Sequence, residues 1–185
     1  MANRLKLSAK YYDLDDYLFR CATARFAKQN TLNAFDFYAI VTWKSNRSTS
    51  KVKDGLKKAN LTPRTLMAKV SACASDRDRM MELDKVTGIG VPIASAILTV
   101  CYPKRFTILD YRAWGALLLL HFKKTKKDKP MPNNIDDYFS IYLPACQVMA
   151  KKHKMTLREL DKAMWGLSKH NSIIKLTKRL RNQRL

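Results

Sequence analysis

The chain has 185 residues, of which 46% are hydrophobic and 10% aromatic, so it can bury one complete core and is not a disordered polyelectrolyte. Its 36 Lys and Arg against 15 Asp and Glu give a formal net charge of +21, which favours a polyanion such as nucleic acid, with a merely soluble basic surface as the alternative. The start of the chain lacks the apolar stretch of a signal peptide, and the longest apolar run, at 116–120, is too short to span a bilayer. We therefore expect a cytoplasmic protein with no membrane partner.

Helical periodicity dominates and strand-like alternation is rare, which predicts an all-α fold in a single domain covering 1–185. The predicted helices span 12–28, 33–43, 50–60, 63–74, 76–85, 91 onward, 111–122, 135–152 and 157 onward. Capping residues mark several of these starts, namely Asn33 with Asp36, Thr62 before Pro63, Asp76, and Thr156 with Glu159. The lysine-rich segment 123–134 is predicted to be a loop. The basic tail 172–185 either packs on the fold with a solvated basic face or lies along phosphates.

Two glycines, one residue apart, separate two of the helical patterns. Gly88 falls where the first pattern must end, and glycine takes a left-handed conformation without strain. Gly90 removes a side chain just before a helix that starts at about Val91, with Pro92 in its first turn. Bare backbone N–H groups at a helix N-terminus suit a phosphate, although a plain turn between helices has the same pattern.

Asp110 begins the next helical pattern, 111–122. Aspartate is a favoured N-cap, so capping alone accounts for it. A carboxylate held rigidly at a helix start is also available for chemistry, and the two roles are compatible.

The stretch 80–120 resembles the core of the helix-hairpin-helix DNA glycosylases, the superfamily of the endonuclease-three-like enzymes. In that family a Leu-Pro-Gly-Val-Gly hairpin is followed by an alanine-rich helix and then by an aspartate that opens another helix. Here Leu83–Gly90, Ala94–Leu98 and "ILDYRAW" match these features, and Asp110 stands 20 residues beyond Gly90. The resemblance implies two helical lobes with a cleft between them and double-stranded DNA as partner. It also implies a catalytic role for Asp110 and phosphate contacts from the hairpin residues, Gly88, Ile89, Gly90 and Val91.

The chemistry that the resemblance implies is base excision, a step of DNA repair in which the target base is flipped out and its N-glycosidic bond hydrolysed. Positive charge develops on the deoxyribose as the base leaves, and a nearby carboxylate stabilises it. Family members that also cleave the strand carry a lysine at the position of Pro92, which indicates a monofunctional enzyme that uses water and leaves an abasic site.

Cofactors are limited by the scattered cysteines. The four cysteines and three histidines lack the spacing of a metal site, and the family's C-terminal cysteine cluster is missing, so we expect no metal and no iron–sulfur centre. The resemblance admits only a monovalent cation held by backbone carbonyls at the hairpin. It implies no protein partner, and we expect a monomer.

Residues 36–52 resemble the family's helix and following polar segment, whose side chains fill the space of an extruded base. Asn46, or failing that Ser45, is the candidate for this role, and either residue would equally serve to link helices. Aromatic and basic neighbours of the motifs are candidates for the substrate pocket, namely Trp43, Lys44, Tyr111 and Trp114, and for DNA contacts, namely Arg47 and Arg112. Tryptophans at helical spacing are also typical core residues, which is the alternative for Trp43, Trp114 and Trp165.

Two other functions remain open from the sequence. One is a non-catalytic DNA-binding module in which Asp110 is only a cap. The other is a glycosylase that attacks modified bases of foreign, phage DNA in defence. The sequence does not identify the excised base.

Overall fold

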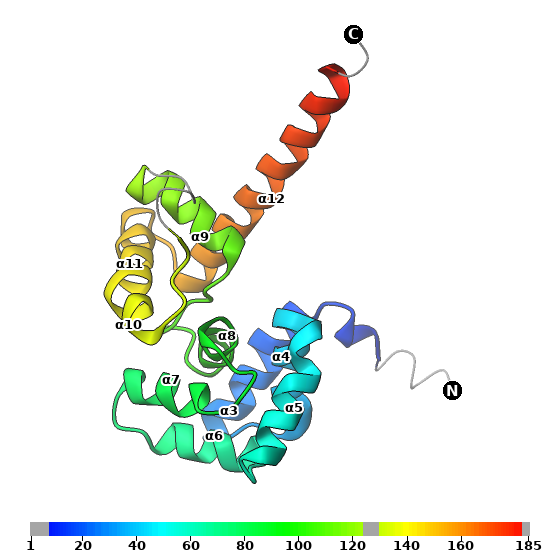
Figure 1. The fold of residues 1–185 in the computed structure, drawn as a ribbon, viewed down its shortest axis with the longest axis vertical. Helices are drawn as coiled ribbons and strands as arrows, with labels where there is room; N and C mark the ends of the chain where they lie inside the picture. The colour runs from blue at the N-terminus through cyan, green and yellow to red at the C-terminus, as the bar shows by residue number, and fades with distance from the viewer. Residues whose placement is uncertain (1–7, 124–129, 183–185) are drawn as a thin grey trace. The chain divides into compact units, whose positions relative to one another are not determined.

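The computed structural model describes residues 8–123 and 130–182, and every regular element in these ranges is helical (Figure 1). The predicted all-α fold is confirmed. The chain divides into two compact units, residues 1–103 and 104–185. The prediction that both belong to one domain stays a prediction. Among the described residues, no helix has the combination of length and apolarity that a membrane crossing needs.

The first unit is built around helix α8. In chain order it contains η1 (Ala9–Tyr11), α2 (Leu14–Tyr17), η2 (Leu18–Ala22), α3 (Thr23–Gln29), α4 (Ala34–Ser45), η3 (Asn46–Ser48), α5 (Thr49–Lys58), α6 (Pro63–Ala72), α7 (Asp76–Asp84) and α8 (Val91–Cys101). All residues of α8 except Pro92 are buried. Helices α3, α4 and α7 pack against it, and Figure 1 shows α8 end-on. The small residues Ala94, Ser95 and Ala96 let these neighbours approach closely.

The second unit has a core of large aromatic side chains. In chain order it contains α9 (Tyr111–Leu117), η4 (Leu118–Phe122), α10 (Ile135–Asp137), η5 (Tyr138–Tyr142), α11 (Leu143–Lys152) and α12 (Leu157–Asn182). Tyr138 donates its hydroxyl to the carbonyl of Thr107 and Tyr142 donates to that of Ile108, each at 2.7 Å. These two bonds hold the extended segment that leads into Asp110.

Three of the predicted helices contain a π-helical turn, formed by η2, η4 or η5. The helix predicted at 12–28 is thus the continuous run α2–η2–α3. At the end of η2 the Thr23 hydroxyl donates to the carbonyl of Leu18 at 3.3 Å and to that of Val100, in α8, at 2.7 Å. The π-turn leaves carbonyl groups without their usual i+4 partner, and a hydroxyl can satisfy them.

Most predicted helix starts agree with the structure, with two corrections. Thr62 accepts from the N–H of Thr65, and Thr156 forms a reciprocal capping box with Glu159. The helix at 76 is capped by Ser75, whose hydroxyl accepts from Asp78, and not by Asp76. This shift by one residue follows from backbone conformation, because a cap must be extended rather than helical.

The second correction concerns Asn33 and Asp36. Asn33 caps α4 by accepting from the N–H of Asp36 at 2.8 Å, but the Asp36 carboxylate does not complete a box on the Asn33 backbone. It bonds to Tyr17, Arg25 and the Asn33 side chain instead.

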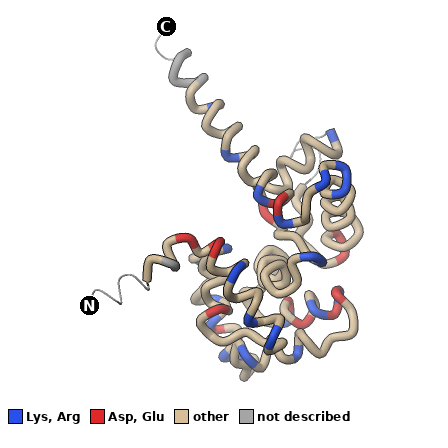
Figure 2. The backbone as a smooth tube through the Cα atoms, turned by 180° about the vertical axis from the view of Figure 1, so that it is seen from behind, with Lys and Arg blue, Asp and Glu red and all other residues tan. Residues whose placement is uncertain are grey.

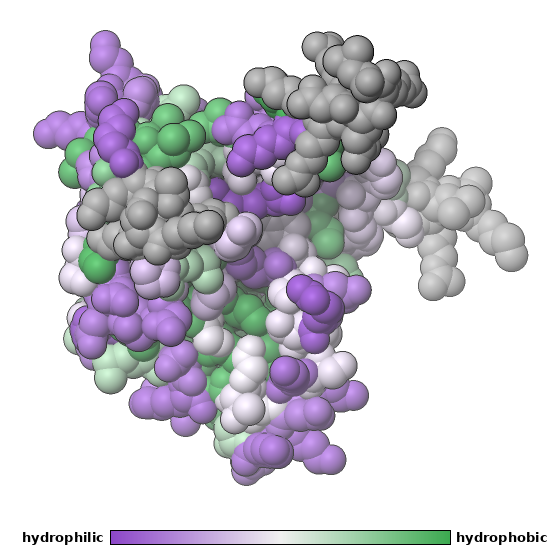
Figure 3. Space-filling view, turned by 45° about the horizontal axis from the view of Figure 1, so that its top comes forward, coloured by the Kyte–Doolittle hydropathy of each residue, from purple (hydrophilic) through white to green (hydrophobic). Residues whose placement is uncertain are grey.

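The predicted loop and tail lie partly outside the described residues, which leave out 124–129 and 183–185. The tail from 172 is helical to Asn182 as the end of α12. Figure 2 shows Lys and Arg spread along the helices of both units. In Figure 3 hydrophilic side chains cover much of the face in view, and apolar patches are exposed between them.

Candidate functional site

The turn between α7 and α8 is shaped by Gly88. Its φ angle is +95°, the only positive φ at a described glycine, so the predicted left-handed glycine is confirmed. The N–H of Ile89 donates to the carbonyl of Val86 at 2.9 Å and closes the turn. A short, hydrogen-bonded connection therefore leads from α7 into α8.

Helix α5 packs backbone to backbone on this turn. A Cβ atom added to Gly88 would lie 2.8 Å from the Lys51 carbonyl carbon and 2.8 Å from the Val52 nitrogen. Reciprocally, a Cβ added to Gly55 in α5 would lie 1.9 Å from the carbonyl oxygen of Thr87. Both glycines are thus required by packing, and they fix the turn against α5.

Gly90 differs from Gly88 because packing does not require it. A Cβ added to Gly90 would meet only the Pro92 ring, at 3.9 Å, and its φ of −85° is open to any residue. Gly90 is exposed and caps α8, whose dipole places partial positive charge at this end. Within the described part of the chain, the N–H groups of Gly90 and Val91 donate to no other protein group. This arrangement is suited to an anion.

The side chains of the other two hairpin residues face the core. Ile89 is 1% exposed and Val91 is 2% exposed, so almost no surface of either residue is available to DNA. Of the four hairpin residues predicted to contact DNA, Gly90 is exposed, Gly88 is half-buried, and Ile89 and Val91 are buried.

Asp110 is half-buried and caps α9. Its Oδ1 accepts hydrogen bonds from the N–H of Arg112 at 2.6 Å and of Ala113 at 3.2 Å. The predicted capping role is therefore confirmed. Because both bonds are to backbone groups of one helix, the carboxylate has a fixed position relative to α9.

A groove of about 480 Å³ begins beside Asp110 in the second unit. It is lined by residues of α9 and η4, namely Tyr111, Arg112, Gly115, Ala116 and Leu119, and by residues of α12, namely Leu167, Ser168, Asn171, Ser172 and Lys175. Its volume is within the range of ligand pockets. Tyr111, a predicted pocket residue, is 66% exposed here, and Arg112, a predicted DNA contact, lines the same groove.

The two predicted tryptophans of the pocket differ in their environment. Trp114 is fully buried, with its ring centroid 5.9 Å from that of Phe122 and 6.2 Å from that of Tyr142. It belongs to the core of the second unit and has no face for a base, which corrects its assignment to the pocket. Trp43 is half-buried in α4 and stacks edge-on against Phe19 at 5.9 Å.

The polar segment after Trp43 forms the end of α4 and the turn η3. Lys44 and Ser45 are half-buried, and the Ser45 hydroxyl lies 2.8 Å from that of Ser48. Asn46 and Arg47 are both exposed. Of the two candidates for filling the space of an extruded base, Asn46 is exposed and Ser45 is half-buried, so Asn46 is the more available.

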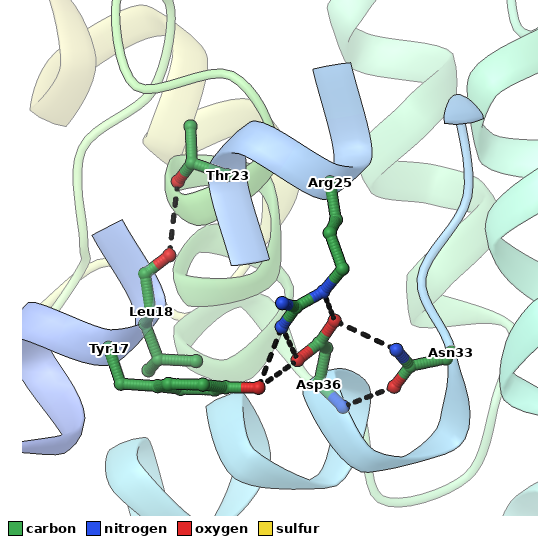
Figure 4. Close-up of polar contacts among 6 residues, drawn as sticks. All are labelled: Tyr17, Leu18, Thr23, Arg25, Asn33 and Asp36. Atoms are coloured by element: carbon green, nitrogen blue, oxygen red, sulfur yellow. Dashed lines mark hydrogen bonds and ion pairs between the residues drawn. The ribbon is translucent and has the colours of Figure 1, made fainter. Parts of the chain in front are cut away.

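A buried carboxylate elsewhere is a structural group. Asp36 is 1% exposed and accepts from Tyr17, from Arg25 at Nε and Nη2, and from Asn33 (Figure 4). The hydrogen bond to Asp36 is the main reason that the pKa of Arg25 is raised above its usual value. Burial, aided by this carboxylate, raises the pKa of Tyr17 to about 12. The three bonds from Tyr17 and Arg25 link the α2–α3 run to α4, and the fourth, from Asn33, lies within the cap of α4, so Asp36 holds the fold of the first unit together.

Two of the four cysteines, Cys101 and Cys146, are buried, whereas Cys21 and Cys73 are half-buried. Burial raises the pKa of the Cys146 thiol to about 12 and that of Cys101 well above its usual value. Thiols protonated in this way are inert. In the ranges 8–123 and 130–182, no group of His, Cys, Asp and Glu has the geometry to hold a metal ion.

Of two further residues near these features, Lys51 was not predicted from sequence, and Trp165 was left open between the core and a substrate contact. Lys51 is exposed, and its backbone touches Gly88. Trp165 in α12 is 41% exposed, with the guanidinium carbon of Arg112 at 5.7 Å and the ammonium of Lys169 at 4.9 Å from its ring centroid. The position of each depends on which helices meet, which no local sequence pattern specifies.

Comparisons of the chain with protein-family models, curated proteins and solved structures find no match in any of the three. The glycosylase resemblance therefore rests on the sequence motifs of 80–120 and of 36–52.

Proposed function

We propose that this protein is a monofunctional DNA glycosylase that flips a modified or mismatched base and hydrolyses its N-glycosidic bond. The observation that carries the proposal is the exposed start of α8. Gly88 is needed for packing, but Gly90 is not, and its missing side chain leaves an exposed residue at the first N–H groups of the helix. A DNA phosphate bound there accepts from the Gly90 N–H and gains from the helix dipole.

Asp110 supplies the carboxylate for the reaction. Its Oδ1 is held by two backbone N–H groups, so it needs little reorganisation as charge develops. When the base departs, electron density leaves the deoxyribose, and a carboxylate near the sugar stabilises the resulting cation and orients the attacking water. In so basic a protein this one carboxylate offsets a local excess of positive charge.

Water is the nucleophile in this proposal. Pro92 occupies the place where strand-cleaving members of the resembled family have a lysine, and proline has no amine to attack the sugar. The product is therefore an abasic site in an uncut strand. Repair of the host's own DNA and attack on modified phage DNA use the same chemistry.

Base release from oligonucleotides tests the proposal. Duplexes with uracil, alkylated, oxidised, mismatched or hypermodified bases are incubated with the native protein and with Asp110→Asn, and abasic sites are detected by alkaline cleavage. We expect release from at least one duplex by the native protein, and loss of release in Asp110→Asn with DNA binding retained. The duplex from which a base is released also distinguishes the two roles: a damaged or mismatched base indicates repair, and a hypermodified base indicates defence against phage DNA.

Asp13 provides a matched control. It too is an N-cap, because it accepts from the N–H of Asp16 at 3.1 Å. It differs from Asp110 in that it is exposed and caps α2 in the first unit. Asp13→Asn should release the base at the native rate. Tight DNA binding without release from any duplex would favour the non-catalytic binding module, with Asp110 as a cap only.

A further inference from the structure

We infer that the groove between α9 and α12 binds an unpaired DNA strand next to the target nucleotide, so that the substrates include single-stranded or locally opened DNA. The inference rests on the proposed function for the identity of the target. It adds a second binding surface, which consists of residues of the second unit alone.

The polar lining of the groove contains donors and no carboxylate. Arg112 and Lys175 contribute positive charge, and Ser168, Asn171 and Ser172 contribute hydroxyl and amide groups. These side chains are the ones that contact phosphate and sugar oxygens in protein–DNA complexes. An anionic strand is therefore complementary to the groove in both charge and hydrogen bonding.

The charge of α12 continues this pattern beyond the groove. From Lys162 to the end of the chain there is no Asp or Glu, whereas Lys and Arg recur throughout. The acidic residues of α12, Glu159 and Asp161, stand before this point, and Asp161 is buried and bonded to Arg158. A backbone that follows α12 thus meets cationic and neutral groups only.

Exposed aromatic rings provide stacking surfaces at the same place. Tyr111 lines the groove, and Arg112 connects it to Trp165, because the guanidinium lies over the indole. The indole of Trp165 is 41% exposed and lies between two cations. The π face of a base can stack on this ring, and the phosphate of the same nucleotide then lies near the cations. Duplex bases are already stacked on one another, so these rings favour an unpaired strand.

Exposed apolar side chains lie in the groove and elsewhere on α12, which raises a protein partner as the competing occupant. Leu119 is 54% exposed, and Ile173 and Leu176 on α12 are 53% and 58% exposed. A second copy of this chain carries the same net charge of +21 and is repelled. The donor-rich lining and the cation-flanked indole favour the nucleic acid.

Fluorescence anisotropy with a labelled oligothymidylate of about 12 nucleotides tests the inference, a length within the ~4–16 nucleotides that such grooves engage. Trp165→Ala should weaken binding by about 5- to 150-fold, the range for the loss of one stacked base. Trp165→Phe keeps a ring and should restore most of the affinity. Lys175→Ala should reduce the slope of log affinity against log salt by about 0.7, the value for one phosphate of a single strand.

Two variants control for the loss of any aromatic ring or any charge. Tyr12→Ala removes a ring that is 97% exposed in the first unit, and Lys152→Ala removes an exposed cation at the end of α11. Both should bind the oligothymidylate like the native protein. Circular dichroism and the thermal midpoint verify that each variant is folded.

The outcomes separate this inference from the proposed function. Base release together with native oligothymidylate binding by Trp165→Ala and Lys175→Ala would overturn the inference and leave the glycosylase proposal standing. Weakened binding by both variants, with no base release from any substrate, would support the groove and count against catalysis. If Leu176→Ser changes the sedimentation of the protein while no groove variant changes oligothymidylate binding, the groove is a protein interface and the inference fails.

Discussion

The carbonyl oxygen of Thr87 lies against Gly55 so closely that a Cβ atom on Gly55 would stand 1.9 Å from it. Gly55→Ala must therefore displace the turn before α8 or push α5 away from it. We expect a loss of about 1–3 kcal/mol in the free energy of unfolding, the usual cost of overpacking. Urea unfolding followed by circular dichroism measures it.

Gly166, in α12, is the matched control for this prediction. A Cβ there would meet nothing within 4 Å, so Gly166→Ala should stabilise the protein by about 0.5–1 kcal/mol through helix propensity. Equal effects of the two substitutions would contradict the packing that we describe.

Gly90→Ala should separate binding from stability. The added methyl group has open space, so the stability should fall by less than about 1 kcal/mol. It crowds the N–H group of this exposed residue, however, and duplex affinity should fall about tenfold or more, as for the loss of a charged hydrogen bond of ~1.5–3 kcal/mol. Anisotropy titrations at fixed salt measure this, and unchanged affinity would remove the hairpin from the interface.

Asp36→Asn should be strongly destabilising because it leaves Arg25 without its carboxylate. Breaking a fully buried pair costs about 3–5 kcal/mol, and we expect the lower end because the Arg25 side chain is 37% exposed. The exposed pair of Arg20 and Asp16 is the comparison. Asp16→Asn should change the unfolding free energy by at most about 0.5 kcal/mol, and a similar loss in both variants would count against the role of burial.

Tyr17 makes the stability dependent on alkaline pH. Its pKa rises from 10.0 to about 12 on folding, so the folded protein keeps a proton that the unfolded chain releases. The contribution is complete below pH 10 and is lost as the pH rises towards 12. The difference in unfolding free energy between native protein and Tyr17→Phe should therefore shrink across this window, as urea titrations at several pH values would show. A constant difference would contradict the shift.

Asp110 should show its two roles separately in stability and activity. Asn is as good an N-cap as Asp, so Asp110→Asn should keep the stability within about 0.5 kcal/mol, whereas Asp110→Ala should lose about 0.5–2 kcal/mol. Thermal unfolding measures both. Loss of base release in Asp110→Asn then cannot be a folding defect, and a large loss of stability in this variant would mean that the carboxylate charge itself holds α9.

Local signals explain which parts of the fold could be predicted from sequence. Caps such as Thr62 and Thr156 act over three residues, so helix starts are readable from the chain. Gly88 likewise announces its positive φ through its residue type. The π-turns could not be predicted, because they depend on tertiary partners such as the Val100 carbonyl that receives the Thr23 hydroxyl.

Local signals also explain which residues of the candidate site could be predicted. Asp110 and Gly90 are marked by local patterns, and the structure gives both the local conformation expected of them. The environments of the tryptophans could not be predicted, since Trp114 and Trp165 both occur in helical, partly apolar stretches. Packing alone decides that the first is fully buried and the second is 41% exposed.

The length of α12 has a consequence for how the protein meets a long polyanion. Its 26 residues span about 39 Å at the α-helical rise, and Figure 1 shows the helix running well past α9. The ionic atmosphere screens charge beyond roughly 8 Å at physiological salt, so a compact protein attracts DNA only at short range. A long helix with cations along its length widens the capture radius, and its contribution should therefore be to the rate of encounter more than to the lifetime of the complex.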